Sequence, residues 1–209
     1  AGADARDRNC GREHPRDQLV MSAIEDASVR TGGRFPRGAV QDVPVTRDGW
    51  VDLAAMAEAI RRASRPLVLL MLANNETGVV QPVAEAAAIV HAAGGLFRVD
   101  AVQGPGRSDC EIGALGADLI RLSAHKIGGP KGVGALIRRN EDIHFPEPLI
   151  RGGGQERGLR AGTENVAGIA DFGAAAAAAQ RHFAAEAVRT CWRCATRWNP
   201  GSRRFRRMP

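Results

Sequence analysis

The sequence predicts an α/β fold in which a mostly parallel β-sheet lies between layers of helices, a three-layer α/β/α arrangement. Three observations lead to this prediction. Short apolar runs alternate along the chain with stretches of helical period. One run, residues 67–73 (LVLLMLA), is apolar at every position, which is typical of a central parallel strand buried on both faces. The loops between the runs are short, as they are in sheets built from strand–helix–strand units.

Local signals place the individual elements along the chain. The first helix is expected over residues 53–63, where Asp52 can cap its start. The second, residues 82–94, has proline in its first turn and glycine at its end. A third is expected to begin near residues 163–164 and to continue through the six alanines of 174–179. Six strands are expected, at residues 19–24, 39–45, 67–73, 96–100, 117–123 and 132–139.

The two ends of the chain differ in composition from its middle. Residues 1–18 are charged and irregular, residues 19–187 are expected to form one large domain, and residues 188–209 are expected to be a basic, disordered tail. Residues 181–209 hold eight arginines and one acidic residue, so the rest of the chain carries a net charge of −1 although the whole carries +6. The domain is therefore not basic, which argues against nucleic-acid binding.

The sequence predicts a cytoplasmic protein without membrane contact. No apolar run approaches the roughly 18–20 residues of a membrane-spanning helix, and the first residues lack the apolar core of a signal peptide. The four cysteines form no dense disulfide framework, which fits a reducing compartment. Cys191 and Cys194 form a CxxC pair that could be a redox pair or half of a zinc site. No second pair accompanies it, so no metal site is expected.

Residues with reactive or hydrogen-bonding side chains follow the ends of the expected parallel strands. In such sheets the ligand lies beyond the carboxyl ends of the strands, so these side chains should converge on one edge. Lys126 is the most informative of them, because a solvated ammonium gains nothing from a place at the end of a buried strand. An amine that attacks an aldehyde to form a Schiff base does gain from it. Taken alone, however, a His-Lys pair is more often solvated surface.

An aldehyde cofactor bound to Lys126 would need help from three kinds of group. An acid beside its ring nitrogen would let the protonated ring accept electrons, and Asp100 is suited to this role. Gln103 or Asn75 could donate to its phenolic oxygen. Its phosphate needs donors, which Ser123 and His125, on either side of Ala124, can supply.

Four segments of the sequence resemble the cysteine desulfurases of the class V aminotransferase family. The resemblance runs from about residue 19 to residue 173, and the segments occur in the family's order. It implies the large domain of a fold type I enzyme that depends on pyridoxal 5'-phosphate (PLP) and is normally a homodimer. The segments are NNETGVVQP (74–82), VDAVQ (99–103), LSAHKIGGPKGVGAL (122–136) and RGGGQERGLRAGTENVAGI (151–169).

The resemblance also implies a role for each candidate residue. Lys126 would carry the PLP Schiff base and shuttle a proton between the substrate Cα and the cofactor. Asp100 would pair with the pyridinium nitrogen and Gln103 with the phenolic oxygen. Asn75 would lie beside the cofactor oxygen and the substrate carboxylate.

The phosphate ligands implied by the resemblance come from two chains. Ser123 and His125 would bind the phosphate within one subunit. Thr163 would reach it across the homodimer interface. The implied reaction converts L-cysteine to L-alanine and passes the sulfur, as an enzyme persulfide, to a sulfur acceptor or scaffold protein for iron–sulfur cluster assembly or thiolation.

Three departures from the family pattern leave alternatives open. Asp26 stands where the family places a histidine over the PLP ring. The glycine-threonine phosphate loop is not recognisable before Leu19, and none of the four cysteines has the context of the family's catalytic cysteine. We therefore expect a chain truncated at both ends. The alternatives are a catalytically impaired fragment, or another class V PLP lyase or aminotransferase.

Overall fold

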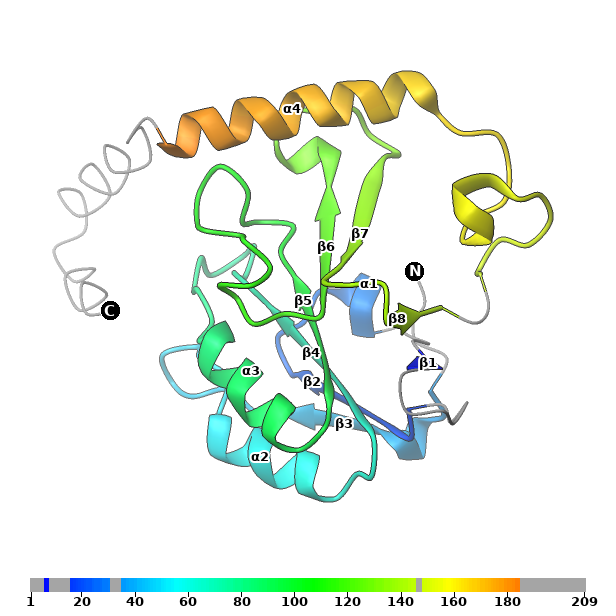
Figure 1. Cartoon of the computed structure of the whole chain (residues 1–209). Helices are drawn as coiled ribbons and strands as arrows, with labels where there is room; N and C mark the ends of the chain where they lie inside the picture. Colours follow the sequence, from blue (N-terminus) through cyan, green and yellow to red (C-terminus); the bar gives the residue numbers. More distant parts are fainter. Residues whose placement is uncertain (1–5, 8–15, 31–34, 146–147, 185–209) are drawn as a thin grey trace, which may run out of the picture.

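A central sheet of six strands organises the chain (Figure 1). The computed structural model describes residues 6–7, 16–30, 35–145 and 148–184. The strand order is β3-β2-β4-β5-β6-β7, in which β3 to β6 run parallel and β7 is antiparallel to β6. The predicted α/β fold with a mostly parallel sheet is therefore confirmed. The strands are β2 (Gln18–Ser22), β3 (Val40–Val43), β4 (Pro66–Met71), β5 (Leu96–Asp100), β6 (Leu119–Ser123) and β7 (Gly134–Arg138).

Helices α2 (Leu53–Arg61) and α3 (Val83–Ala92) cover one face of the sheet (Figure 1). The carboxylate of Asp52 accepts the backbone N–H groups of Ala54 and Ala55, both at 3.0 Å, and so caps α2 as the sequence predicts. Beneath the two helices lies the larger apolar core, which includes Val68 and Phe97, both without exposed surface.

The opposite face is covered by shorter elements. The single turn α1 (Ala27–Arg30) places Val29 on it, and Ile143 of β8 (Ile143–His144) packs there too. Strand β8 pairs with β1 (Arg6–Asp7), a two-residue contact inside the segment that the sequence predicts to be irregular. Sheet leucines toward the amino ends of the strands complete a second, smaller core: Leu19, Leu67, Leu69, Leu96 and Leu119.

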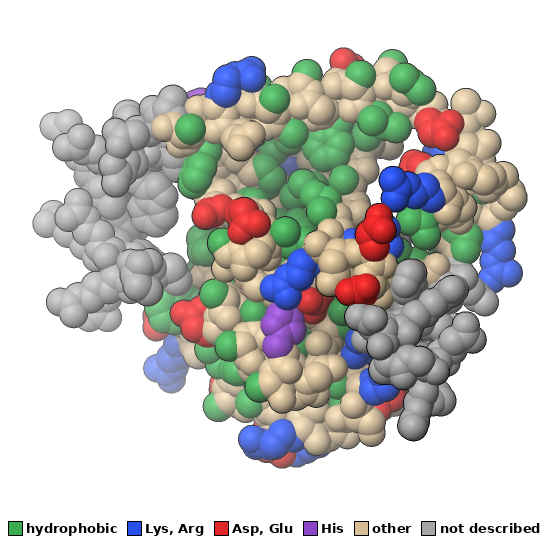
Figure 2. Space-filling view, viewed as in Figure 1, with side chains coloured by type: hydrophobic (Ala, Val, Ile, Leu, Met, Phe, Trp, Pro, Cys, Tyr) green, Lys and Arg blue, Asp and Glu red, His purple; other side chains and the backbone are tan. Residues whose placement is uncertain are grey.

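Helix α4 (Val166–Ala184) lies across the end of the sheet near Lys126 (Figure 1). Figure 2 shows apolar side chains gathered between this helix and the sheet. Three short 3-10 turns complete the described structure: η1 (Arg37–Ala39), η2 (Ala124–Lys126) and η3 (Gln155–Gly158). Within the described ranges, no helix is both long and apolar enough to cross a bilayer. The predicted tail, 188–209, with Cys191 and Cys194, lies outside the described residues.

Candidate active site

A cavity of about 230 Å³ opens at the carboxyl ends of the parallel strands. Strand β2 leads to β3 on one side, and the chain then returns to β4 on the other, so the strand order reverses at β2. Open α/β sheets bind ligands beside such a reversal. Six of the seven predicted site residues line the cavity: Asn75, Asp100, Gln103, Ser123, His125 and Lys126. It is also lined by Asp26, Met71, Ala73, Val102 and Arg121.

Strand register brings three of these side chains into one row. Met71 of β4 pairs with Asp100 of β5, and Asp100 pairs with Arg121 of β6. Aligned residues in neighbouring strands point to the same face, which here is the face of the smaller core. The row therefore forms the floor of the cavity, with Met71 and Asp100 at the last residues of β4 and β5 and Arg121 two residues before the end of β6.

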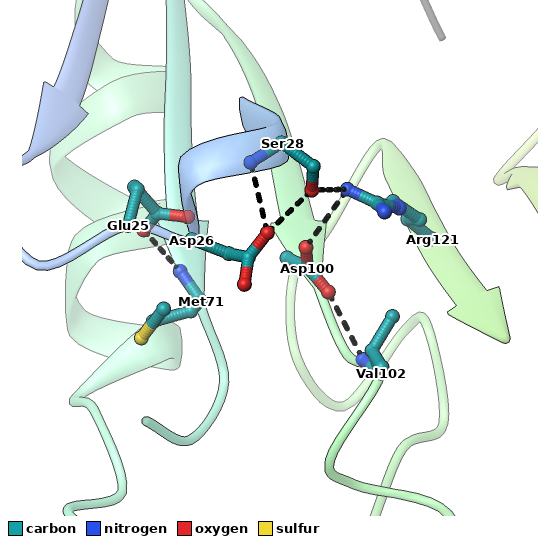
Figure 3. A network of polar contacts seen from close by, with 7 residues as sticks. All are labelled: Glu25, Asp26, Ser28, Met71, Asp100, Val102 and Arg121. Atoms are coloured by element: carbon teal, nitrogen blue, oxygen red, sulfur yellow. Dashed lines mark hydrogen bonds and ion pairs between the residues drawn. The ribbon is translucent and has the colours of Figure 1, made fainter. Parts of the chain in front are cut away.

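Asp100 is held in a fixed position on this floor (Figure 3). One carboxylate oxygen accepts the backbone N–H of Val102 at 3.1 Å, and the other pairs with Nη1 of Arg121 at 3.3 Å. The Asp100 side chain is 11% exposed. It therefore presents a shielded, oriented carboxylate to whatever enters the cavity.

A turn after β2 joins the same polar network (Figure 3). Arg121 Nη1 donates to the Ser28 hydroxyl at 3.1 Å, and that hydroxyl donates to Asp26 at 2.5 Å. The backbone N–H of Ser28 also donates to Asp26, at 2.9 Å. These two Ser28 donors hold the pKa of Asp26 below its usual value, and the positive charges of Arg121 and Lys126 act in the same direction. Asp26 is thus a carboxylate at the edge of the cavity.

Lys126 lies in the turn η2 directly after β6 and is half-buried. Arg107 ties this turn to the loop after β5, because its guanidinium donates to the carbonyl of Lys126 at 3.3 Å and to that of Gln103 at 3.4 Å. The hydroxyl of Ser123 and Nδ1 of His125 lie 2.8 Å apart. The two residues predicted to bind phosphate therefore form a hydrogen-bonded pair beside the lysine.

Asn75 and Thr163 occupy different surroundings. Asn75 is an exposed residue at the rim of the cavity, in a turn held by its neighbour Asn74, whose side chain accepts the N–H groups of Glu76 and Thr77. Thr163 is exposed and does not line the cavity of its own chain. Its predicted role across a dimer interface remains a prediction.

The sequence reasoning did not identify Glu25, Ser28, Arg107 or Arg121 as parts of the site. Arg121 left the clearest signal, since it is a charged residue at the centre of an otherwise apolar strand, LIRLS. Such a residue needs a partner, and the neighbouring strand ends in Asp100. Ser28 and Glu25 left none, because the turn that positions them has no hydrophobic period.

A second hollow, of about 260 Å³, lies at the opposite ends of β5 and β6. Asp118 there accepts the backbone N–H of Phe97 at 2.8 Å and lies 3.0 Å from the imidazole of His91. These contacts fix the start of β5, so we regard the hollow as structural. In the described part of the chain, no group of His, Cys, Asp and Glu side chains is placed to hold a metal ion.

Comparisons with known proteins agree with the geometry. The aminotransferase class V family matches residues 11–191. This chain belongs to that family. A cysteine desulfurase from Cereibacter sphaeroides is 46% identical over 168 residues, which are 77% of this chain and 42% of that protein. The cysteine desulfurase IscS of Anaeromyxobacter sp. (strain Fw109-5) is 49% identical over 146 residues, or 69% of this chain and 36% of that protein.

Solved structures in the same group share the fold. The X-ray structure of a NifS-like protein from Rickettsia africae ESF-5 matches with a TM-score of 0.74 at 38% identity. The match covers 80% of this chain and 46% of that one. The class V chain described here therefore spans less than half the length of each of these relatives.

The cavity residues fit the PLP cofactor on which class V aminotransferases and cysteine desulfurases depend. They supply one amine, at Lys126, and one carboxylate that is largely shielded from water, at Asp100. Hydroxyl and imidazole groups from Ser123 and His125 lie next to the lysine and can donate to a phosphate. The chemistry of this donor set therefore fits PLP.

Proposed function

We propose that this chain carries the PLP site of an L-cysteine desulfurase. The observation that carries the proposal is the shared cavity of Lys126 and Asp100 at the carboxyl ends of β5 and β6. The cysteine desulfurases that match most of this chain support the choice of reaction within the class V family.

Each residue of the cavity would have a separate role in binding the cofactor or the substrate. Lys126 would hold the cofactor through its amine and move a proton at the substrate Cα. Asp100, oriented by Val102 and Arg121, would keep a positive charge on the ring nitrogen. PLP supplies the electron-accepting ring. Gln103 would face the phenolic oxygen, and Asn75 the substrate carboxylate.

The phosphate would be held by residues of two subunits. Ser123 and His125 belong to the same cavity as Lys126. Thr163 would come from the second subunit of a homodimer, which accounts for its place outside its own chain's cavity. A cytoplasmic location and a sulfur-acceptor or scaffold partner complete the proposal, and they rest on the cysteine pattern and on the IscS relative respectively.

Asp26 sets a limit on the chemistry. With its pKa held low, it is ionised at neutral pH and has no proton to donate. It would therefore be a poor acid toward a departing sulfur. Proton delivery would fall to Lys126, and we expect slow turnover.

The test is alanine formation from L-cysteine by the purified chain in the presence of PLP and an added thiol such as dithiothreitol, which accepts the departing sulfur atom as a persulfide. The chain has two lysines, 126 and 131, so Lys131→Ala is a matched control for Lys126→Ala. We expect alanine from the unmodified chain and from Lys131→Ala, and none above background from Lys126→Ala. Equal alanine formation by both variants, or none by the unmodified chain, would contradict the proposal.

A further inference from the structure

Next to the site lies a buried acid, Glu25, which the proposed reaction does not use. It follows β2, and its residue is 5% exposed. One carboxyl oxygen accepts the backbone N–H of Met71 at 2.6 Å, at the last residue of β4 (Figure 3). The other oxygen is buried and has no hydrogen-bond partner among the described residues. Burying such a group costs free energy, so its retention calls for an explanation.

A buried cation lies on the neighbouring strand. Arg98 of β5 is 7% exposed and pairs in register with Leu69, two residues before Met71. Its side chain points to the same face as Asp100, since residues two apart in a strand share a face. Its Nε is buried without a hydrogen-bond partner in the described structure. Arg98 therefore lies beneath the cavity floor, in the same electrostatic environment as Glu25.

We propose that Glu25 is a positioning residue that joins the Asp26 turn to the end of β4 behind Asp100. Among the described residues, the backbone N–H of Met71 is the one hydrogen-bond partner of the Glu25 carboxyl group, and the Asp26 turn follows Glu25 directly. Through Ser28 and Arg121 the same turn reaches Asp100. Moving Glu25 would therefore disturb Asp26 and the orientation of Asp100 together.

The burial of Glu25 and the charges around it indicate the protonation state in which it links the Asp26 turn to β4. Asp26 on its own turn and Asp100 on β5 are anions, while Arg98 on β5 is the nearby cation that favours ionisation. Burial is the largest influence and raises the pKa of Glu25 to about 8, against the lowering effect of the Met71 N–H. Glu25 is then neutral at pH 7. Burial also lowers the pKa of Arg98, but a guanidinium stays charged in proteins.

A neutral Glu25 predicts a pH dependence for the folded chain itself. Its pKa is about 8 when folded and near 4.5 when unfolded, so the folded state binds this proton more tightly. The stabilisation is fully present below about pH 4.5 and is lost as the pH rises to about 8. Above that pH a third carboxylate would appear beside Asp26 and Asp100.

The first test follows thermal unfolding of the cofactor-free chain from pH 5 to pH 9. Glu25→Gln keeps an oxygen for the Met71 N–H and resembles the neutral acid, so it should remain folded and lose most of the decline in melting temperature between pH 5 and pH 8. Glu85→Gln, on the exposed side of α3, should keep that decline. An unchanged decline in Glu25→Gln, or destabilisation as large as that of Glu25→Ala, would overturn the inference.

The second test concerns the site, and this part rests on the proposed function. PLP affinity, followed by the visible absorbance of the bound cofactor, should fall about tenfold in Glu25→Ala and be restored in Glu25→Gln. Binding by the unmodified chain should weaken above pH 8, and that by Glu25→Gln should not. If PLP binds no variant, the proposed function fails while the unfolding test still decides the state of Glu25. If PLP binds all variants alike, the positioning role fails alone.

Discussion

The two faces of the central sheet use the same strands for different purposes, and β5 shows this within five residues. Phe97 and Val99 point toward α2 and α3 and have no exposed surface. Leu96, Arg98 and Asp100 point to the opposite face. On that face only Leu96 belongs to the apolar core, and the next two side chains toward the carboxyl end, Arg98 and Asp100, are charged.

Alternate residues of a strand therefore have different roles. Those on one face stabilise the fold, and those on the other face supply the chemical groups of the cavity. One face buries apolar surface along its whole length, which is the main source of folding free energy. The other gives up part of that burial so that carboxylate, guanidinium and amine groups can face a cavity. A change on the first face should alter unfolding, whereas a change at the end of the second should alter cofactor binding.

The largest effect is expected on the apolar face. Phe97→Ala removes a fully buried aromatic ring from the larger core and should lower the free energy of unfolding by about 3–5 kcal/mol. Phe183→Ala is the matched control, because Phe183 on α4 is 40% exposed. Urea denaturation of both variants measures the difference. Similar losses in the two would mean that the face under α2 and α3 does not hold the main core.

The next effect tests how closely this core approaches the cavity. Gly104 follows Gln103, and a Cβ there would lie 2.7 Å from Leu72 and overlap the sulfur of Cys110. Gly104→Ala should therefore cost about 1–3 kcal/mol of stability through overpacking. In Gly173→Ala, within α4, the added methyl meets nothing within 4 Å, and higher helix propensity should give a small gain. Thermal melts compare the two, and a neutral Gly104→Ala would contradict the packing.

Asp100→Asn tests the polar face. The amide can still accept the N–H of Val102 but lacks the charge that would face a pyridinium, so PLP affinity should fall about 10- to 100-fold. Unfolding should change far less than in Phe97→Ala. Asp48→Asn, at an exposed turn, serves as the control. Absorbance titration with PLP measures the affinity, and unaltered affinity would remove Asp100 from the site.

The smallest effect concerns the helical cover of the apolar face. Asp52→Ala removes the cap of α2 and should cost about 1 kcal/mol in chemical denaturation, with PLP binding unaffected. Asp48→Ala should cost little. A shift in PLP affinity on losing the Asp52 cap would show that the two faces are coupled.

Much of this arrangement could be predicted from the sequence. The six strands and the helices of 53–61 and 83–92 lie within a few residues of the predicted ranges, because hydrophobic period and caps are local signals. The convergence of Asn75, Asp100 and Lys126 on one edge also followed, since parallel strands present their carboxyl ends together.

The rest depends on which strands are neighbours. The row Met71–Asp100–Arg121 exists only because β4, β5 and β6 lie side by side in one register, and no local pattern states that. The link from Glu25 to Met71 spans 46 residues and joins a turn to a strand end. Thr163 cannot be placed from one chain, because its predicted role needs a second subunit.

The most direct test of the central claim is to locate PLP on the chain. Borohydride reduction of the chain with PLP, followed by peptide mass mapping, fixes the cofactor permanently to the lysine that holds it. We expect the pyridoxyl label on Lys126, with little on Lys131, the other lysine of the chain. Equal labelling of the two lysines, or labelling of Lys131 alone, would show that the cavity at the carboxyl ends of the strands is not a PLP site.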